Sequence, residues 1–161
     1  ARAIEVGVRA YLEHHNRRKV TKASEIPHGK QTVKQLIGKL PVCGICTGHL
    51  VIGLALGCKI EKLKFGHHGA NQPVKSTESG KTYITSQNHG YTVKTDALPL
   101  DCTISYINVN DGTCEGLTYH SFPGFSVQFH PEACGGPHDT EFLFQQFIDL
   151  MEGGKKHATE Y

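Results

Sequence analysis

The chain has 161 residues, of which 38% are hydrophobic and 20% are charged, as expected of a globular protein with one domain rather than two. Its net charge is only +2 and its longest basic run is Arg17-Arg18-Lys19, so we expect no nucleic-acid partner. No apolar segment is long enough to cross a bilayer and no signal peptide is found, so we expect no membrane partner.

The first part of the chain carries weak signals for regular structure, and Pro27 and Gly29 indicate a turn. Elements are expected over residues 4–8 (a strand), 9–18 (a polar helix) and 31–37 (a helix ended by Gly38). We therefore divide the chain into residues 1–30, an N-terminal segment of the same domain; residues 31–152, the core; and residues 153–161, a flexible tail.

The most informative stretch is Gly44-Ile45-Cys46-Thr47-Gly48, the thiol form of a pattern that puts a nucleophile on a sharp strand-to-helix turn. We predict a buried strand over Val42–Ile45 and an apolar helix over His49–Leu56, with Cys46 at the turn between them. The two flanking glycines suit such a turn because side chains there would crowd the backbone. The positive end of the helix dipole would favour the thiolate of Cys46.

Other interpretations of this stretch remain open. Cys46 could be an ordinary buried cysteine. Cys43-Gly44-Ile45-Cys46 is also the C-x-x-C pattern of redox pairs, although Cys43 lies in the predicted strand, where an attacking thiol is not expected. No zinc site is predicted, because no second pair of cysteines or histidines follows at ligand spacing. Six cysteines without a regular framework favour reduced thiols.

Beyond the predicted helix, which Gly57 should end, the pattern changes to short strands and turns. Asp111-Gly112 is a strong hairpin signal. Strands are predicted over residues 59–65, 81–86, 91–93, 104–110, 113–119 and 125–129, and loops over 66–74 and 87–90. A last helix, capped by Asp139 or Thr140, places Phe144, Ile148 and Met151 on one face.

The strand that ends at Phe129 leads directly into His130-Pro131-Glu132. Pro131 stiffens the turn, and Glu132 can accept a hydrogen bond from the ring nitrogen of His130 that faces away from a nucleophile. Cys46, His130 and Glu132 thus supply a nucleophile, a base and an orienting carboxylate, the three groups of a triad for acyl transfer.

The order of helix, strand, elbow, helix and later hairpins predicts an α/β fold. We expect a mostly parallel central sheet flanked by helices, with Cys46 at the carboxyl end of its strand. The hairpin around Asp111-Gly112 should add antiparallel strands at one side.

The motifs Gly44–His49 and Phe129–Glu132 resemble the two signatures of class I glutamine amidotransferase domains, which implies their flavodoxin-like fold. Further segments are similar to the small, glutamine-hydrolysing chains of carbamoyl phosphate synthetases: residues 65–69, 71–74, 86–91 and 136–140. The similarity runs almost without a break from Lys34 to Met151.

This resemblance implies a glutaminase in which Cys46 attacks the side-chain amide of glutamine, His130 shuttles protons and Glu132 orients His130. The residues that it implies for the substrate are Thr47, whose amide nitrogen is an oxyanion donor, and Asn88, Gly90 and Tyr91, which hold the amino-acid end of glutamine. The ammonia would pass to a separate large synthetase chain, which uses ATP and magnesium. No cofactor or metal is therefore expected on this chain, and its location would be the cytoplasm or an organelle.

Two departures from the family pattern bear on activity. Leu50 stands where the family has a substrate-binding glutamine, and this removes a polar contact. An Asn-Gly-Pro-Gly-Asp-Pro loop, which would give a second oxyanion donor, is not found, and Ile26-Pro27-His28-Gly29 occupies its region. Two functions follow: an active glutaminase, or a catalytically weak domain that binds and regulates a synthetase. A hydrolase of γ-glutamyl peptides on the same scaffold is a more distant alternative.

Overall fold

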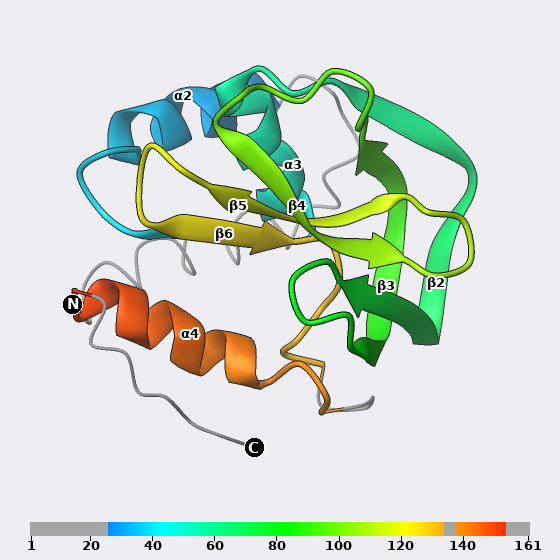
Figure 1. The fold of residues 1–161 in the computed structure, drawn as a ribbon. Coiled ribbons are helices and arrows are strands. Elements are labelled where there is room, and N and C mark those ends of the chain that lie inside the picture. The colour runs from blue at the N-terminus through cyan, green and yellow to red at the C-terminus, as the bar shows by residue number, and fades with distance from the viewer. Residues whose placement is uncertain (1–25, 134–137, 154–161) are drawn as a thin grey trace.

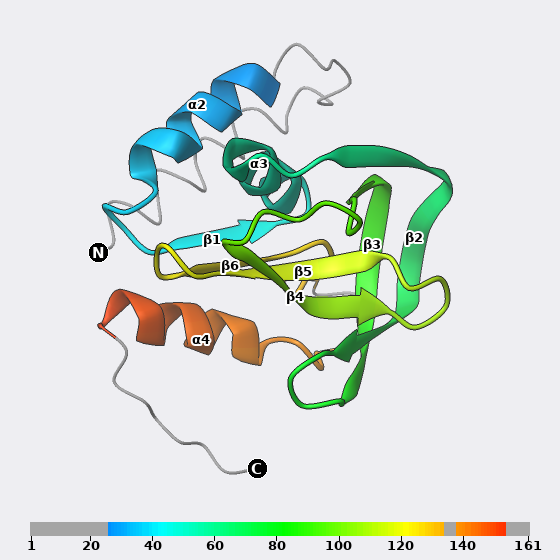
Figure 2. The same ribbon diagram turned by 45° about the horizontal axis from the view of Figure 1, so that its top comes forward.

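A computed structural model describes residues 26–133 and 138–153 of the chain. Its elements are α2 (Ile26–Leu36), β1 (Val42–Ile45), α3 (Thr47–Leu56), β2 (Ile60–Ser76), β3 (Thr82–Val93), β4 (Cys102–Asn108), β5 (Cys114–Tyr119), β6 (Gly124–Val127) and α4 (Phe142–Met151). The strands form one sheet in the order β1-β6-β5-β4-β2-β3 (Figure 1). Figure 2 shows α2 and α3 above this sheet and α4 below it. The described elements therefore confirm an α/β fold.

The sheet is mixed, and this corrects the expectation that most of its strands are parallel. β1 and β6 pair in parallel, and the other neighbouring pairs of described strands are antiparallel. The connections after β2 are short, and a connection of a few residues can join only antiparallel neighbours. The predicted hairpin is confirmed between β4 and β5, where Gly112 has a φ of 73°. The strand and helix predicted over residues 4–18, and the tail beyond residue 153, lie outside the described residues.

β2 and β3 form a long hairpin, and the loops predicted over residues 66–74 and 87–90 lie inside these two strands. The pairing shifts register twice along β2, once between Lys62 and His67 and once between Gly69 and Gln72. Glycine allows the backbone to bulge at both places, because Gly66 has a φ of 72° and Gly69 a φ of 127°. The polar residues that indicated loops are therefore paired strand residues with bulges between them.

The helices differ from the prediction at their ends and in one buried face. α2 begins at Ile26, so Pro27 lies in its first turn, where proline is tolerated, and not in a loop. α3 ends as predicted, with Gly57 in the left-handed region at φ 98°. The N-cap of α4 is Glu141, and its inward residues are Leu143, Phe147 and Leu150, whereas Phe144 and Ile148 are exposed. α4 has apolar residues on more than one face, so the sequence pattern did not decide which face packs against the sheet.

Each face of the sheet carries its own apolar cluster. Beneath α2 and α3, Ile52 lies in a cluster with Leu117 and Phe122. On the opposite face, Leu143 of α4 lies in a cluster with Val127 and other buried residues of the sheet. β1 and β6 are thus packed from both sides, which fixes the turns that follow them. No helix in the described ranges is long and apolar enough to cross a membrane.

Candidate active site

Cys46 lies at the carboxyl end of β1, one residue before α3 begins at Thr47. Its backbone has φ 52° and ψ −106°, a region that residues with a side chain rarely occupy. Within residues 26–133 and 138–153 it is the one non-glycine residue with a positive φ. The amide of Cys46 donates a hydrogen bond of 2.8 Å to the carbonyl of Val127, so β6 holds the strained turn in place. This geometry is that of a nucleophile elbow.

One of the two glycines that flank Cys46 is required by packing. A Cβ atom on Gly44 would lie 2.5 Å from Cδ1 of Ile52 and 2.9 Å from the carbonyl oxygen of Gly48, because β1 and the first turn of α3 lie against each other there. A Cβ atom on Gly48 would meet no other atom within 4 Å. The expectation that both glycines are needed for space is therefore correct only for Gly44.

His130 directly follows Phe129, where the chain leaves the carboxyl end of β6. Its backbone amide donates to the carbonyl of Ser86 on β3 at 2.9 Å, and its Nδ1 donates to Oε1 of Glu132 at 2.7 Å. The second ring nitrogen, Nε2, remains for the nucleophile. Hydrogen bonding to the Cys46 sulfur, and then to Glu132, raises the pKa of His130 to about 10. The fold therefore brings together Cys46, His130 and Glu132, and it favours an imidazolium beside the sulfur.

Cys43 differs sharply from Cys46. It is a residue of β1, and its side chain packs against the apolar cluster between the sheet and α4. Burial raises the pKa of its thiol to about 12. Both residues are free cysteines. A thiol with so high a pKa is a poor attacking group at neutral pH. The environment of Cys43 is thus that of a core residue and does not suit a redox pair.

Gln128 is a residue near the sulfur that was not predicted. Its side chain is fully buried, and its Nε2 donates to Sγ of Cys46 at 3.8 Å. This contact helps to orient the Cys46 side chain. The available signal was weak, since Ser126 and Gln128 are both polar residues between Phe125 and Phe129.

The other predicted site residues lie around this centre. Thr47 opens α3, so its amide belongs to the first turn, whose N–H groups have no acceptor within the helix. Asn88, Gly90 and Tyr91 lie on β3, the strand to which His130 is tied through Ser86. Leu50 lies one turn after Cys46 on α3 and packs against the apolar cluster on that face.

The chain is similar to curated carbamoyl phosphate synthase small chains over most of its own length. A carbamoyl phosphate synthase small chain from Oceanobacillus iheyensis is 49% identical over 132 residues, which are 81% of this chain and 36% of the relative. The chloroplastic carbamoyl phosphate synthase small chain of Arabidopsis thaliana is 47% identical over 135 residues, 84% of this chain and 31% of the relative. The chain thus spans about a third of the length of these curated relatives.

A solved structure shares the fold. The structure of a glutamine amidotransferase from Thermotoga maritima superposes with a TM-score of 0.59 at 21% identity, covering 84% of this chain and 59% of that one. The family model for glutamine amidotransferase class-I matches residues 19–150, which include the elbow, the His130–Glu132 pair and all the described strands. This chain belongs to the class-I glutamine amidotransferase family.

Proposed function

We propose that this chain is the glutamine-hydrolysing domain of a carbamoyl phosphate synthetase and supplies ammonia to a large synthetase chain. The observation that carries this proposal is the strained turn at Cys46 together with His130, whose pKa the Cys46 sulfur raises and which donates to Glu132 at 2.7 Å. The names of the relatives that match most of this chain support the choice of synthetase.

In the first half of the reaction, the thiolate of Cys46 attacks the side-chain amide carbon of glutamine. The negative charge on the amide oxygen would be stabilised by the backbone N–H of Thr47, the residue after the nucleophile. His130, which holds the proton taken from the thiol, gives it to the amide nitrogen as the C–N bond breaks. Ammonia leaves, and the glutamyl group stays on Cys46 as a thioester.

In the second half, His130 takes a proton from water, which attacks the thioester carbon. The C–S bond breaks, glutamate leaves, and the sulfur recovers its negative charge beside the imidazolium of His130. Glu132 accepts the Nδ1 hydrogen bond in both halves, so it keeps Nε2 directed at the reacting atoms.

Substrate and partner complete the proposal. Asn88, Gly90 and Tyr91 would hold the amino and carboxylate end of glutamine, and Leu50 would lie where a polar contact to the substrate is lost. The two half-reactions use no cofactor or metal on this chain. ATP and magnesium would act on the large chain, in the cytoplasm or in an organelle.

A glutamine hydrolysis assay with and without an added large synthetase chain tests this function. We expect ammonia and glutamate in equal amounts. We also expect turnover about 10²- to 10³-fold below that of a full-length relative, because the loop that would give a second oxyanion donor is not found in the sequence. Turnover equal to that of the relative would show that another donor replaces the loop. Binding to the large chain without any hydrolysis would instead favour the regulatory alternative.

A further inference from the structure

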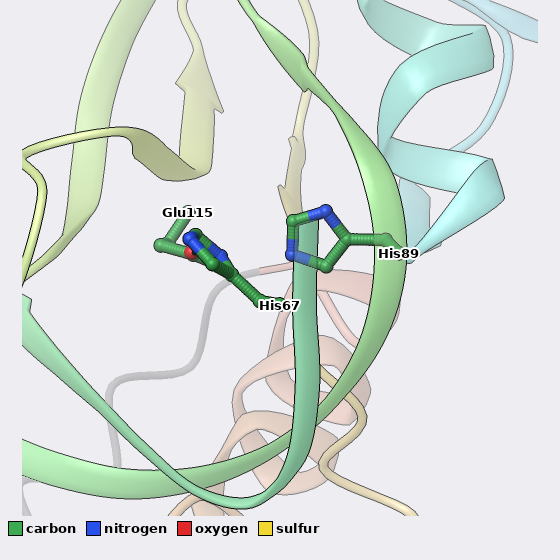
Figure 3. Close-up of side chains that lie close together, drawn as sticks. All are labelled: His67, His89 and Glu115. Atoms are coloured by element: carbon green, nitrogen blue, oxygen red, sulfur yellow. Dashed lines mark ion pairs between the residues drawn. The ribbon is translucent and has the colours of Figure 1, made fainter. Parts of the chain in front are cut away.

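A group of buried polar residues outside the proposed active site brings metal-ligand atoms together. His67 on β2, His89 on β3 and Glu115 on β5 are 8%, 7% and 0% exposed. Each offers one ligand atom, and these atoms all lie within 4.8 Å of one another. Figure 3 shows that the two imidazoles and the carboxylate converge from three separate strands. No ligand spacing marks these residues along the chain, because they are far apart in sequence and meet only in the sheet.

The two imidazoles are oriented from outside the cluster. Nε2 of His67 donates to Oδ2 of Asp111 at 2.9 Å, and Nδ1 of His89 donates to the carbonyl of Tyr91 at 2.8 Å. A neutral histidine that donates from one nitrogen presents a lone pair on the other. With both rings in the neutral form, as a metal ion requires, Nδ1 of His67 and Nε2 of His89 would therefore face the cluster as acceptors. A carboxylate or a backbone carbonyl on the far nitrogen is the usual second contact of a metal-binding histidine.

The remaining groups at the centre are mainly acceptors as well. Oε1 of Gln87 lies 3.1 Å from Nδ1 of His67 and 2.8 Å from Nε2 of His89. Oε1 of Glu115 lies 2.9 Å from Nδ1 of His67 and accepts from Nδ2 of Asn108 at 3.1 Å, and Oε2 of Glu115 is buried without a hydrogen-bond partner. Without a cation, a proton on His67 can bridge to Glu115. The lone pairs of Gln87 Oε1 and His89 Nε2 would still face each other at 2.8 Å, which costs free energy in a buried site.

We propose that His67, His89, Glu115 and the side-chain oxygen of Gln87 bind one divalent transition metal ion of the Zn²⁺ class. Two imidazoles, a carboxylate and an amide oxygen suit Zn²⁺ better than Mg²⁺ or Ca²⁺, which prefer oxygen ligands alone. Donor atoms at about 2.0–2.2 Å from a tetrahedral zinc are about 3.3 Å apart. The three separations of 2.8–3.1 Å would open slightly, and any wider separation within the 4.8 Å span of the His67, His89 and Glu115 atoms would close. The carboxylates of Glu115 and Asp111 would balance the two positive charges.

The ion would have a structural role. Four protein ligands that are deep in the sheet leave no open position for a reactant. The ion would tie β2, β3 and β5 together beside Asn88 and Gly90, which flank His89 on β3. Binding would release the proton that bridges His67 and Glu115 in the metal-free chain.

Calorimetric titration of the chelator-treated full chain with zinc chloride tests this inference. We expect one tightly bound zinc ion per chain, with at least about 100-fold weaker binding in Glu115→Gln and about 10- to 100-fold weaker binding in Asp111→Asn. His120→Asn is the matched control, because His120 is exposed and bonded to Thr103. The Asp111 side chain is 43% exposed, so Asp111→Asn tests the site even if Glu115→Gln does not fold.

Titration with Co²⁺ in place of Zn²⁺ shows whether the metal binds at this site or at cysteine thiolates. We expect a cobalt spectrum without the strong charge-transfer band of a cobalt–thiolate bond. The inference would be overturned if the wild-type chain bound no stoichiometric zinc, if Asp111→Asn bound zinc as tightly as wild type, or if the cobalt spectrum showed a thiolate ligand.

Discussion

Replacing His130 with asparagine is expected to lower the rate of glutamine hydrolysis by at least about 10⁴-fold, because His130 is the group that takes the thiol proton and delivers it to the leaving amide nitrogen. Glu132→Gln should cost less, by about one to two powers of ten, because the carboxylate orients His130 and does not itself transfer a proton. The measurement is ammonia release in the steady state for both variants.

A second readout ties the effect of Glu132 to His130. The Glu132 carboxylate is one of the groups that raise the pKa of His130 to about 10, so Glu132→Gln should lower this pKa, as followed by NMR titration of the ring. His120→Asn should leave the rate unchanged, since His120 lies outside the site. A fully active His130→Asn variant would show that His130 is not the base.

Replacing Gly44 with alanine is expected to destabilise the fold by about 1–3 kcal/mol, because the added methyl group overpacks the contact between β1 and α3. Ile52 could move its terminal carbon, but the backbone of Gly48 would lie 2.8 Å from the added methyl group and cannot yield without shifting the elbow. Intrinsic strand preference alone would make Gly44→Ala stabilising, since alanine is favoured over glycine in a strand. The free energy of unfolding from urea titrations decides between the two.

Gly48→Ala is the matched control for this prediction. It adds the same methyl group one turn away, where no atom lies within 4 Å, so we expect stability to be unchanged or slightly improved. Equal destabilisation by both substitutions would mean that the close approach of β1 and α3 does not explain the need for glycine at position 44.

The elbow could be predicted from the sequence because its signals are local. Cys46 and Gly57 each mark a backbone change within a few residues, and the structure has these turns where the pattern put them. The same holds for Asp111-Gly112, which fixes a hairpin by its own turn chemistry.

The missed features depend on contacts between distant residues. Residues 66–74 are rich in glycine and polar residues yet pair with β3 through two bulges, and a short-range pattern cannot distinguish such a strand from a loop. The inward face of α4 is set by the sheet that it covers. His67, His89 and Glu115 come from three strands, so their proximity follows only from the sheet order.

Labelling with a glutamine analogue that carries an alkylating group tests most directly whether Cys46 is the nucleophile of a glutamine site. After incubation with a limiting amount of the analogue, peptide mass spectrometry should place the label on Cys46 alone. Free glutamine should protect Cys46, and Cys43 should stay unlabelled because burial raises the pKa of its thiol to about 12. A native Cys43–Cys46 disulfide with neither thiol alkylated, or labelling of Cys43 that glutamine does not prevent, would contradict this role of Cys46.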